Sequence, residues 1–156
     1  MRRKCRQAGS VSLEFMMLFP LVVAVLYATA VYGITFFGKY QMQDAADRAV
    51  AAALLVDRSA YEDDKIEDAI RNQAKSALEK LVTKLPAGWR DRLDADCDVA
   101  ESGVVAPGMV DVEMLECSLT YNDFGNKPIV PGLNFGWLGK FPPLPASLAV
   151  KASVAF

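Results

Sequence analysis

The amino-acid sequence predicts an α+β protein. We expect a long N-terminal transmembrane helix that continues outward, a second amphipathic helix and a small antiparallel β-sheet with a disulfide. Three observations support this prediction. An uncharged apolar run occupies residues 15–38, apolar residues recur at helical spacing over 59–85, and short strand-like and turn-like segments follow residue 88.

The apolar run predicts a membrane span. Hydrophobic residues make up 53% of the chain, and the 24 residues from Phe15 to Gly38 include no charge. A helix of this length rises about 36 Å, which is enough to cross the hydrocarbon core of a bilayer with some tilt. A buried soluble helix is the alternative, but such a helix seldom runs this long without a polar face. Pro20 is the one helix breaker in the run, and membrane helices tolerate proline with a kink.

The charges around the run predict its orientation. Four cations (Arg2, Arg3, Lys4 and Arg6) precede it, and no acidic residue precedes Glu14. The positive-inside rule keeps such an N-terminus in the cytoplasm and sends the rest of the chain outward. Setting these four aside leaves 13 of the 17 basic residues against 19 acidic ones. An acidic exported domain is a poor partner for nucleic acid, whose phosphates require clustered cations.

The helix is expected to continue beyond the membrane, and a second helix follows it. Small apolar residues recur at helical spacing up to Leu55, so we expect one helix from about Leu13 to Leu55. Ser59 and Glu62 match a capping box that would begin the second helix, and Pro86 with the following residues would end it.

The remainder of the chain predicts strands and one ordered loop. Residues 110–121 mostly alternate between apolar and polar, and residues 148–156 read as a closing strand. Between them, residues 128–145 contain five prolines and several glycines. We interpret this segment as an ordered loop held by its large apolar residues: Phe135, Trp137, Leu138 and Phe141. These side chains could bind a partner, although packing of the loop is their more common use.

Three cysteines fall on the two sides of the predicted membrane. Cys5 lies in the basic N-terminal segment, whereas Cys97 and Cys117 lie in the exported part, where disulfides persist. We predict a bridge between Cys97 and Cys117, closing a loop of about 20 residues and contributing roughly 3 kcal/mol by the chain-entropy model. Two buried free thiols are the alternative.

The sequence gives little support for catalysis. It contains no histidine, which removes the most common general base and a frequent metal ligand. Asp94, Asp96 and Asp98 imitate the beginning of a calcium loop, but Val99 and Val105 occupy the positions where that loop requires Gly and Glu. We interpret the three aspartates as a solvated acidic approach to Cys97. We therefore expect no enzyme, no cofactor and no metal site.

The most informative motif precedes the apolar run. A basic segment ends at Gly9, Ser10 begins a stretch of four residues, and Glu14 and Phe15 open the run. A carboxylate at the entrance of a membrane helix is costly, so it requires a reason. This arrangement resembles the processing site of type IV-like prepilins of the Flp/Tad class. The resemblance implies that a membrane aspartyl prepilin peptidase cuts after Gly9.

Cleavage at that bond would give Glu14 a partner. The new amino group on Ser10 would be charged at neutral pH, and Glu14 lies about one helical turn away. The two charges attract strongly in an apolar environment. In related filaments such pairs are thought to form between neighbouring subunits. Simple placement of Glu14 at the level of the lipid headgroups is the alternative reading.

Further residues narrow the resemblance. Leu18-Phe19-Pro20 is one residue shorter than the Leu-x-x-Pro motif of TadE-like minor pilins, and residues 43–49 resemble their Gln/Asn-Ala-Ala-Arg-rich helix. The match covers about the first third of the chain. It implies a basic leader at 1–9, a transmembrane and assembly helix at 10–57, and an exported α+β domain at 58–156. The implied partners are prepilin peptidase, other pilin or pseudopilin subunits, the Tad inner-membrane machinery and the lipid bilayer.

Two alternatives remain open at this point. Ala28-Thr29-Ala30 is an acceptable signal-peptidase site, after which Val31 would begin a secreted envelope protein. A membrane-tethered binding protein with no link to pili is the other. Pro20 inside the h-region and the continuation of the apolar run through Phe37 count against the signal peptide. We therefore expect a TadE-like minor pilin or pseudopilin in the bacterial inner membrane, taking part in pilus assembly and surface adhesion.

Overall fold

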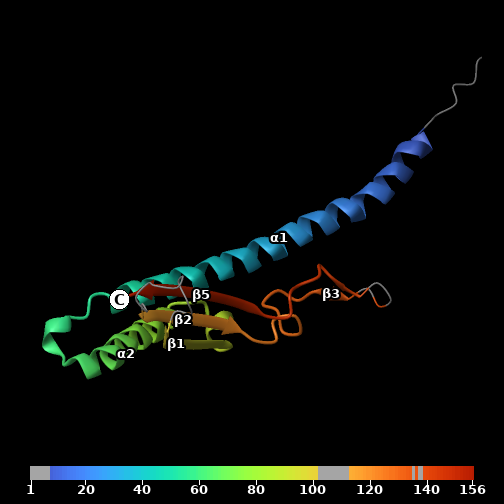
Figure 1. The fold of residues 1–156 in the computed structure, drawn as a ribbon. Helices are drawn as coiled ribbons and strands as arrows, with labels where there is room; N and C mark the ends of the chain where they lie inside the picture. Colours follow the sequence, from blue (N-terminus) through green and yellow to red (C-terminus); the bar gives the residue numbers. More distant parts are fainter. Residues whose placement is uncertain (1–7, 102–112, 135, 137–138) are drawn as a thin grey trace, which may run out of the picture.

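The computed structural model describes residues 8–101, 113–134, 136 and 139–156, and it confirms the predicted α+β class. Figure 1 shows one long helix whose C-terminal half lies on a small domain and whose N-terminal half extends beyond it. The helical elements are α1 (Ala8–Ala53), η1 (Arg58–Ala60), α2 (Asp63–Val82) and α3 (Ala87–Arg90). The strands are β1 (Leu93–Glu101), β2 (Glu113–Tyr121), β3 (Leu133–Asn134), β4 (Lys140–Phe141) and β5 (Leu148–Ala155).

The first helix is continuous. It runs for 46 residues and includes Pro20, where the sequence predicts a kink. Figure 1 shows α1 curving along its length without a break. Proline removes one backbone hydrogen bond, and a helix can accommodate that loss by bending. The candidate span and the outer helix are therefore parts of one continuous helix.

The domain is a sheet covered by helices. β1, β2 and β5 form an antiparallel sheet in that order, with β2 in the centre. Every second residue of β2 from Leu115 to Tyr121 is buried, which identifies one face of the sheet as the core face. α1 contacts β2 and β5, α2 contacts β1, and the two helices also contact each other. β3 and β4 form a separate two-stranded ladder.

The structure corrects the expected beginning of the second helix. Ser59 does not cap α2; its backbone N–H and hydroxyl both donate to the carboxylate of Asp57, at 3.0 and 2.7 Å, within the η1 turn. These hydrogen bonds lower the pKa of Asp57. α2 begins at Asp63, and its cap residue Glu62 makes no side-chain capping bond. The capping-box prediction was therefore wrong. Ser59 is hydrogen-bonded to the carboxylate of Asp57, two residues upstream, and does not cap α2.

The structure adds a strand around Cys97 that the sequence analysis did not assign. Asp94, Asp96 and Asp98, interpreted from the sequence as a solvated acidic approach to Cys97, belong to strand β1. All three are exposed, and Cys97 between them is buried. Aspartate is disfavoured in strands, which hid the period-two alternation. Of the large apolar residues expected in the loop, Phe141 lies in β4, and Phe135, Trp137 and Leu138 lie outside the described residues.

Candidate functional site

The predicted processing residues lie at the beginning of α1. Gly9 and Ser10 fall in its first turn, and Glu14 follows about one turn later with an exposed side chain. The first four N–H groups of a helix have no partner within the helix, so this turn is its weakest part. Phe15 is also exposed, and its ring lies 5.6 Å from that of Phe19. The motif thus lies at the N-terminal end of the exposed segment of α1.

The N-terminal half of α1 is apolar and almost bare. Only 6% of its most apolar 18-residue window is buried, so it does not have the packing of a soluble core helix. The helix is long and apolar enough to cross a membrane, which makes it a candidate membrane span. Contiguous apolar surface of this size marks contact with a membrane or another protein. Its large exposed side chains are Leu13, Phe15, Met16, Met17, Leu18, Phe19, Leu21, Val22, Val23, Val25 and Leu26.

The surroundings of α1 change at Val31. From this residue to Ala53, one stripe of the helix faces the domain, with buried positions every three or four residues. Its buried members are Val31, Thr35, Gly38, Met42, Ala45, Ala46, Ala49, Val50 and Ala53. The hydroxyl of Thr35 donates to the carbonyl of Val31 at 2.9 Å, so the buried polar atom is satisfied. The opposite face keeps Ile34, Phe36 and Tyr40 exposed.

Gly38 is packed against the domain. The predicted span ends at this residue, and the indole of Trp89 on α3 occupies the space where a side chain would project. Trp89 is buried and stacks on Phe124 at 6.0 Å, with Tyr121 edge-on at 5.8 Å. The sequence analysis missed both α3 and Trp89. A glycine inside an apolar helix was the one available signal, because it permits close approach of a large group.

A proline-rich arm lies against α1. We define this arm as the described residues from Pro128 to Pro145. The hydroxyl of Tyr27 donates to the carbonyl of Pro131, and the hydroxyl of Tyr32 donates to that of Pro143 at 3.0 Å. Figure 1 shows the β3 region of the arm extending along α1 beyond the sheet. The arm therefore contacts residues that hydropathy alone assigns to the membrane.

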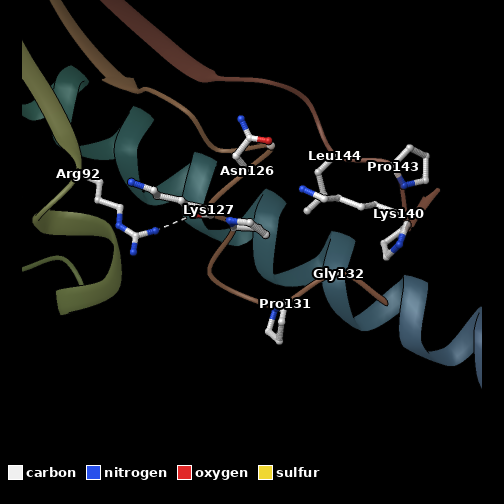
Figure 2. Close-up of a pocket in the computed structure, with 11 residues that line it drawn as sticks. Arg92, Asn126, Lys127, Pro131, Gly132, Lys140, Pro143 and Leu144 are labelled. Atoms are coloured by element: carbon white, nitrogen blue, oxygen red, sulfur yellow. Dashed lines mark hydrogen bonds between the residues drawn. The ribbon is translucent and has the colours of Figure 1, made fainter. Parts of the chain in front are cut away.

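A basic pocket opens between the arm and the end of the sheet. It has a volume of about 570 Å³, and three cationic side chains line it: Arg92, Lys127 and Lys140 (Figure 2). None of the described residues that line it is acidic. Arg92 donates to the carbonyl of Lys127 at 2.8 Å and to the hydroxyl of Tyr121 at 2.9 Å. This network holds the beginning of the arm on the strands.

The predicted disulfide is present. Cys97 and Cys117 are paired directly across β1 and β2, with a Cα–Cα distance of 4.1 Å, and both are buried. The bridge joins the edge strand β1 to the central strand, beneath the two helices. It stabilises the domain and exposes no reactive thiol.

The acidic residues of β1 form ion pairs. Asp96 lies 3.6 Å from Lys75, and Asp98 lies 3.9 Å from Arg71, both on α2. Within the described part of the chain, no group of three His, Cys, Asp or Glu residues could hold a metal ion. Asp96 and Asp98 therefore serve as ion-pair partners that join β1 to α2.

Fold and site together define a class: an α+β domain whose first helix extends beyond it as a bare apolar segment and candidate membrane span. Comparison with protein families then gives a particular match, because residues 9–51 match the family described as TadE-like protein. This match confirms the resemblance predicted from the sequence, and it covers α1 from Gly9 almost to the end of the helix. Searches of curated proteins and of solved structures give no significant match.

Proposed function

We propose that this chain is a minor pilin or pseudopilin of a Tad-type pilus. The family match associates it with that pilus system and with a structural role. In this proposal, prepilin peptidase cuts between Gly9 and Ser10, and the subunit waits in the bacterial inner membrane. It crosses the membrane once, with its N-terminus in the cytoplasm and the α+β domain exported. It then takes part in pilus assembly and surface adhesion through contacts with other pilin subunits.

One observation carries the proposal. The TadE-like match begins at Gly9, the residue after which the prepilin resemblance implies cleavage, and it covers the whole bare half of α1. A bare apolar helix has two ways to remove its surface from water. It can lie in lipid, or it can pack against similar helices in a filament. A pilin needs both states in succession, and the exposed half of α1 is suited to both.

The carboxylate of Glu14 would help to order the transfer of the helix from the lipid to the filament. It is the first acidic residue of the chain, and its side chain is exposed at the beginning of the apolar run. After cleavage, the Ser10 amino group of a neighbouring subunit would neutralise it. An unpaired charge in an apolar helix bundle is costly, so correct pairing would also fix the register between subunits.

N-terminal sequencing of the mature chain tests the processing step. The chain is expressed with prepilin peptidase, with an inactive peptidase, and as a Gly9→Val variant. Ser10 should be the first residue only with active peptidase and Gly9. Replacing Gly33, which has open space around it, serves as the matched control and should leave processing intact. Retention of Met1 with the active peptidase would rule out the proposed cleavage.

A second candidate rests on a separate observation. The buried stripe of α1 begins at Val31, the residue that would follow signal-peptidase cleavage after Ala30. A chain cut there keeps the entire core stripe and loses the bare half of α1 together with the hydrogen bond from Tyr27 to the arm. Such a protein would be a secreted or tethered envelope binding protein. Its mature N-terminus would be Val31, or Met1 if uncleaved, so the same sequencing experiment separates it from the pilin.

A further inference from the structure

The domain begins to cover α1 at Val31. The buried stripe of the helix starts at this residue, which is 1% exposed, and continues past Gly38, where the Trp89 indole lies. Residues 15–26 are mostly exposed. The sheet and the other helices therefore lie beyond the N-terminal half of α1 and leave it open to a bilayer (Figure 1).

The thickness of a bilayer fixes how far a span must reach along α1. After the proposed cleavage the helix begins at Ser10, and the roughly 30 Å of a hydrocarbon core requires about 20 residues of helix. The span therefore extends at least to about Ala30, one residue before the buried stripe begins. An uncleaved chain has nearly the same limit, because its cations at positions 2–6 remain outside the hydrocarbon. A tilted helix has to reach further.

One part of the arm lies on the membrane side of this limit. We define the tip of the arm as its described residues from Pro131 to Phe141. The carbonyl of Pro131 accepts a hydrogen bond from Tyr27, and Leu133 lines an apolar groove of about 310 Å³ between the tip and α1. The α1 residues that line the groove are Phe19, Pro20, Val23, Ala24 and Tyr27.

The tip cannot stay in this position while α1 spans the bilayer. Ala24 lies about 9 Å and Phe19 about 16 Å inside the boundary at Ala30, so the tip would lie in the hydrocarbon beside them. Irregular backbone and open strand edges do not face lipid chains. The described ladder of the tip has only two residue pairs, and one of its members is Lys140, whose ammonium would also lose water. Docking of the tip and insertion of α1 therefore exclude each other.

The base of the arm is held by the domain. Ile129 and Leu144 pack against the hydrophobic core, and the side chain of Pro142 is fully buried. The hydroxyl of Tyr32 donates to the carbonyl of Pro143 at 3.0 Å. Because Tyr32 lies beyond the limit at about residue 30, none of these contacts enters the hydrocarbon.

The tip, by contrast, rests on α1 through contacts that are easily lost. Leu133 is 45% exposed although it lines the groove, so its side chain is not locked in place. Release of Tyr27 strands no polar group, because this residue lies only about 4 Å inside the boundary. Tyrosine is enriched at that depth, where its hydroxyl bonds to water or headgroups.

We infer that the tip of the arm has two positions: docked on α1 outside the bilayer, and released from α1 while the helix spans it. The base stays on the domain in both. When α1 leaves the lipid, the tip docks and covers apolar surface from Phe19 to Tyr27, which opposes return of the helix to the membrane. This inference rests on the membrane span in the proposed function. It does not depend on leader cleavage or on pilus assembly.

Spin-label distances test the two positions. Nitroxides are attached to Ala24→Cys and Leu133→Cys, which line the same groove, in a Cys5→Ser chain with the disulfide intact. The pair is measured in lipid nanodiscs and in an amphipathic polymer that keeps the chain soluble without a bilayer. The distance should be short in the polymer and longer in nanodiscs by about 9 Å or more, the depth of Ala24. Nitroxides at Glu67→Cys and Asp94→Cys, both exposed on the domain, should give the same distance in both.

Insertion is measured separately, so that failure of the anchor can be distinguished from failure of the inference. In nanodiscs, Val22→Cys should resist a membrane-impermeant maleimide, whereas the exposed Ser59→Cys should react. A short distance between the groove labels with Val22→Cys protected would overturn the two positions and leave the anchor intact. A long distance in the polymer as well would mean that the tip does not dock, which also overturns them. Rapid labelling of Val22→Cys would overturn the anchor and the inference together.

A covalent link tests whether docking and insertion exclude each other. A short bis-maleimide joins Ala24→Cys to Leu133→Cys in the polymer, and the chain is then transferred to liposomes. Alkaline carbonate should extract the linked chain, whereas the same chain capped with N-ethylmaleimide should remain in the membrane. Equal retention of the two would refute the exclusion, and failure of the two cysteines to link would refute the docked position.

Removal of one tyrosine hydroxyl tests the docking contact. Tyr27→Phe keeps the apolar run but loses the hydrogen bond to Pro131. The ratio of docked to released tips in the polymer should fall by about threefold or more, while insertion into nanodiscs is retained. Tyr40→Phe, at an exposed position of the same helix, should leave the ratio unchanged. Equal ratios in the two variants would contradict docking through Tyr27.

Discussion

The indole of Trp89 occupies the position that a side chain at Gly38 would need. A Cβ added to Gly38 would lie 1.9 Å from Cζ2 of Trp89, far closer than two carbon atoms can approach. α1 and α3 can therefore pack together only because residue 38 has no side chain. This contact joins the helix to the aromatic cluster of the domain.

Replacing Gly38 with alanine should destabilise the domain. The indole would have to move out of its stack with Phe124, and overpacking of this kind costs about 1–3 kcal/mol. Urea unfolding in detergent micelles, followed by circular dichroism, measures the effect. The matched control is Gly33→Ala, which adds a methyl group in open space on the same helix. Equal stability of the two variants would contradict the contact.

Removing the disulfide should lower the stability of the domain by roughly 3 kcal/mol on the chain-entropy model. A Cys97→Ala/Cys117→Ala chain removes the bridge without leaving a free thiol. Its urea midpoint is compared with that of Cys5→Ser, which should match the unmodified chain. Mass spectrometry without reduction should find no alkylatable thiol at Cys97 or Cys117, and detection of two would refute the bridge.

The hydroxyl of Tyr121 should contribute to the position of the arm. It accepts from Arg92 and donates to the carbonyl of Lys127, both at 2.9 Å. Tyr121→Phe removes these bonds and should cost about 1–2 kcal/mol in the free energy of unfolding. Tyr61→Phe, at an exposed position, is the control and should be neutral. Limited proteolysis should cut the arm faster in Tyr121→Phe alone, and equal cleavage rates would argue against the network.

Replacement of Glu14 should separate processing from assembly. Glu14→Ala and Glu14→Leu leave Gly9 intact, so prepilin peptidase should still release Ser10. Without the carboxylate, the Ser10 amino group has no partner, and piliation measured by electron microscopy should fall. Glu67→Ala, on an exposed position of α2, controls for a general effect of losing a carboxylate. Normal piliation in the Glu14 variants would remove that residue from the assembly mechanism.

Local pattern predicted much of the structure. The apolar run was recognised by its length without a charge, and the helix after it and strands β2 and β5 were recognised by the spacing of their apolar residues. The disulfide was predicted from the compartment, because only Cys97 and Cys117 lie in the part of the chain that the charge pattern predicts to be exported. Strand β1 was missed since its outward residues are aspartates, and the beginning of α2 was wrong since Asp57 competes for Ser59.

The sequence by itself determined that this protein has a membrane-length apolar helix with a charged entrance at Gly9 to Glu14. Those are properties of neighbouring residues, and no folding is needed to read them. Only the tertiary structure decided how much of that helix is free to meet lipid. Tyr27 and Pro131 are 104 residues apart in the chain, and Gly38 on α1 contacts Trp89 on the separate helix α3. Hydropathy adds up each residue's own preference for lipid. The covered half of the run is instead determined by contacts with groups that lie far away in the chain.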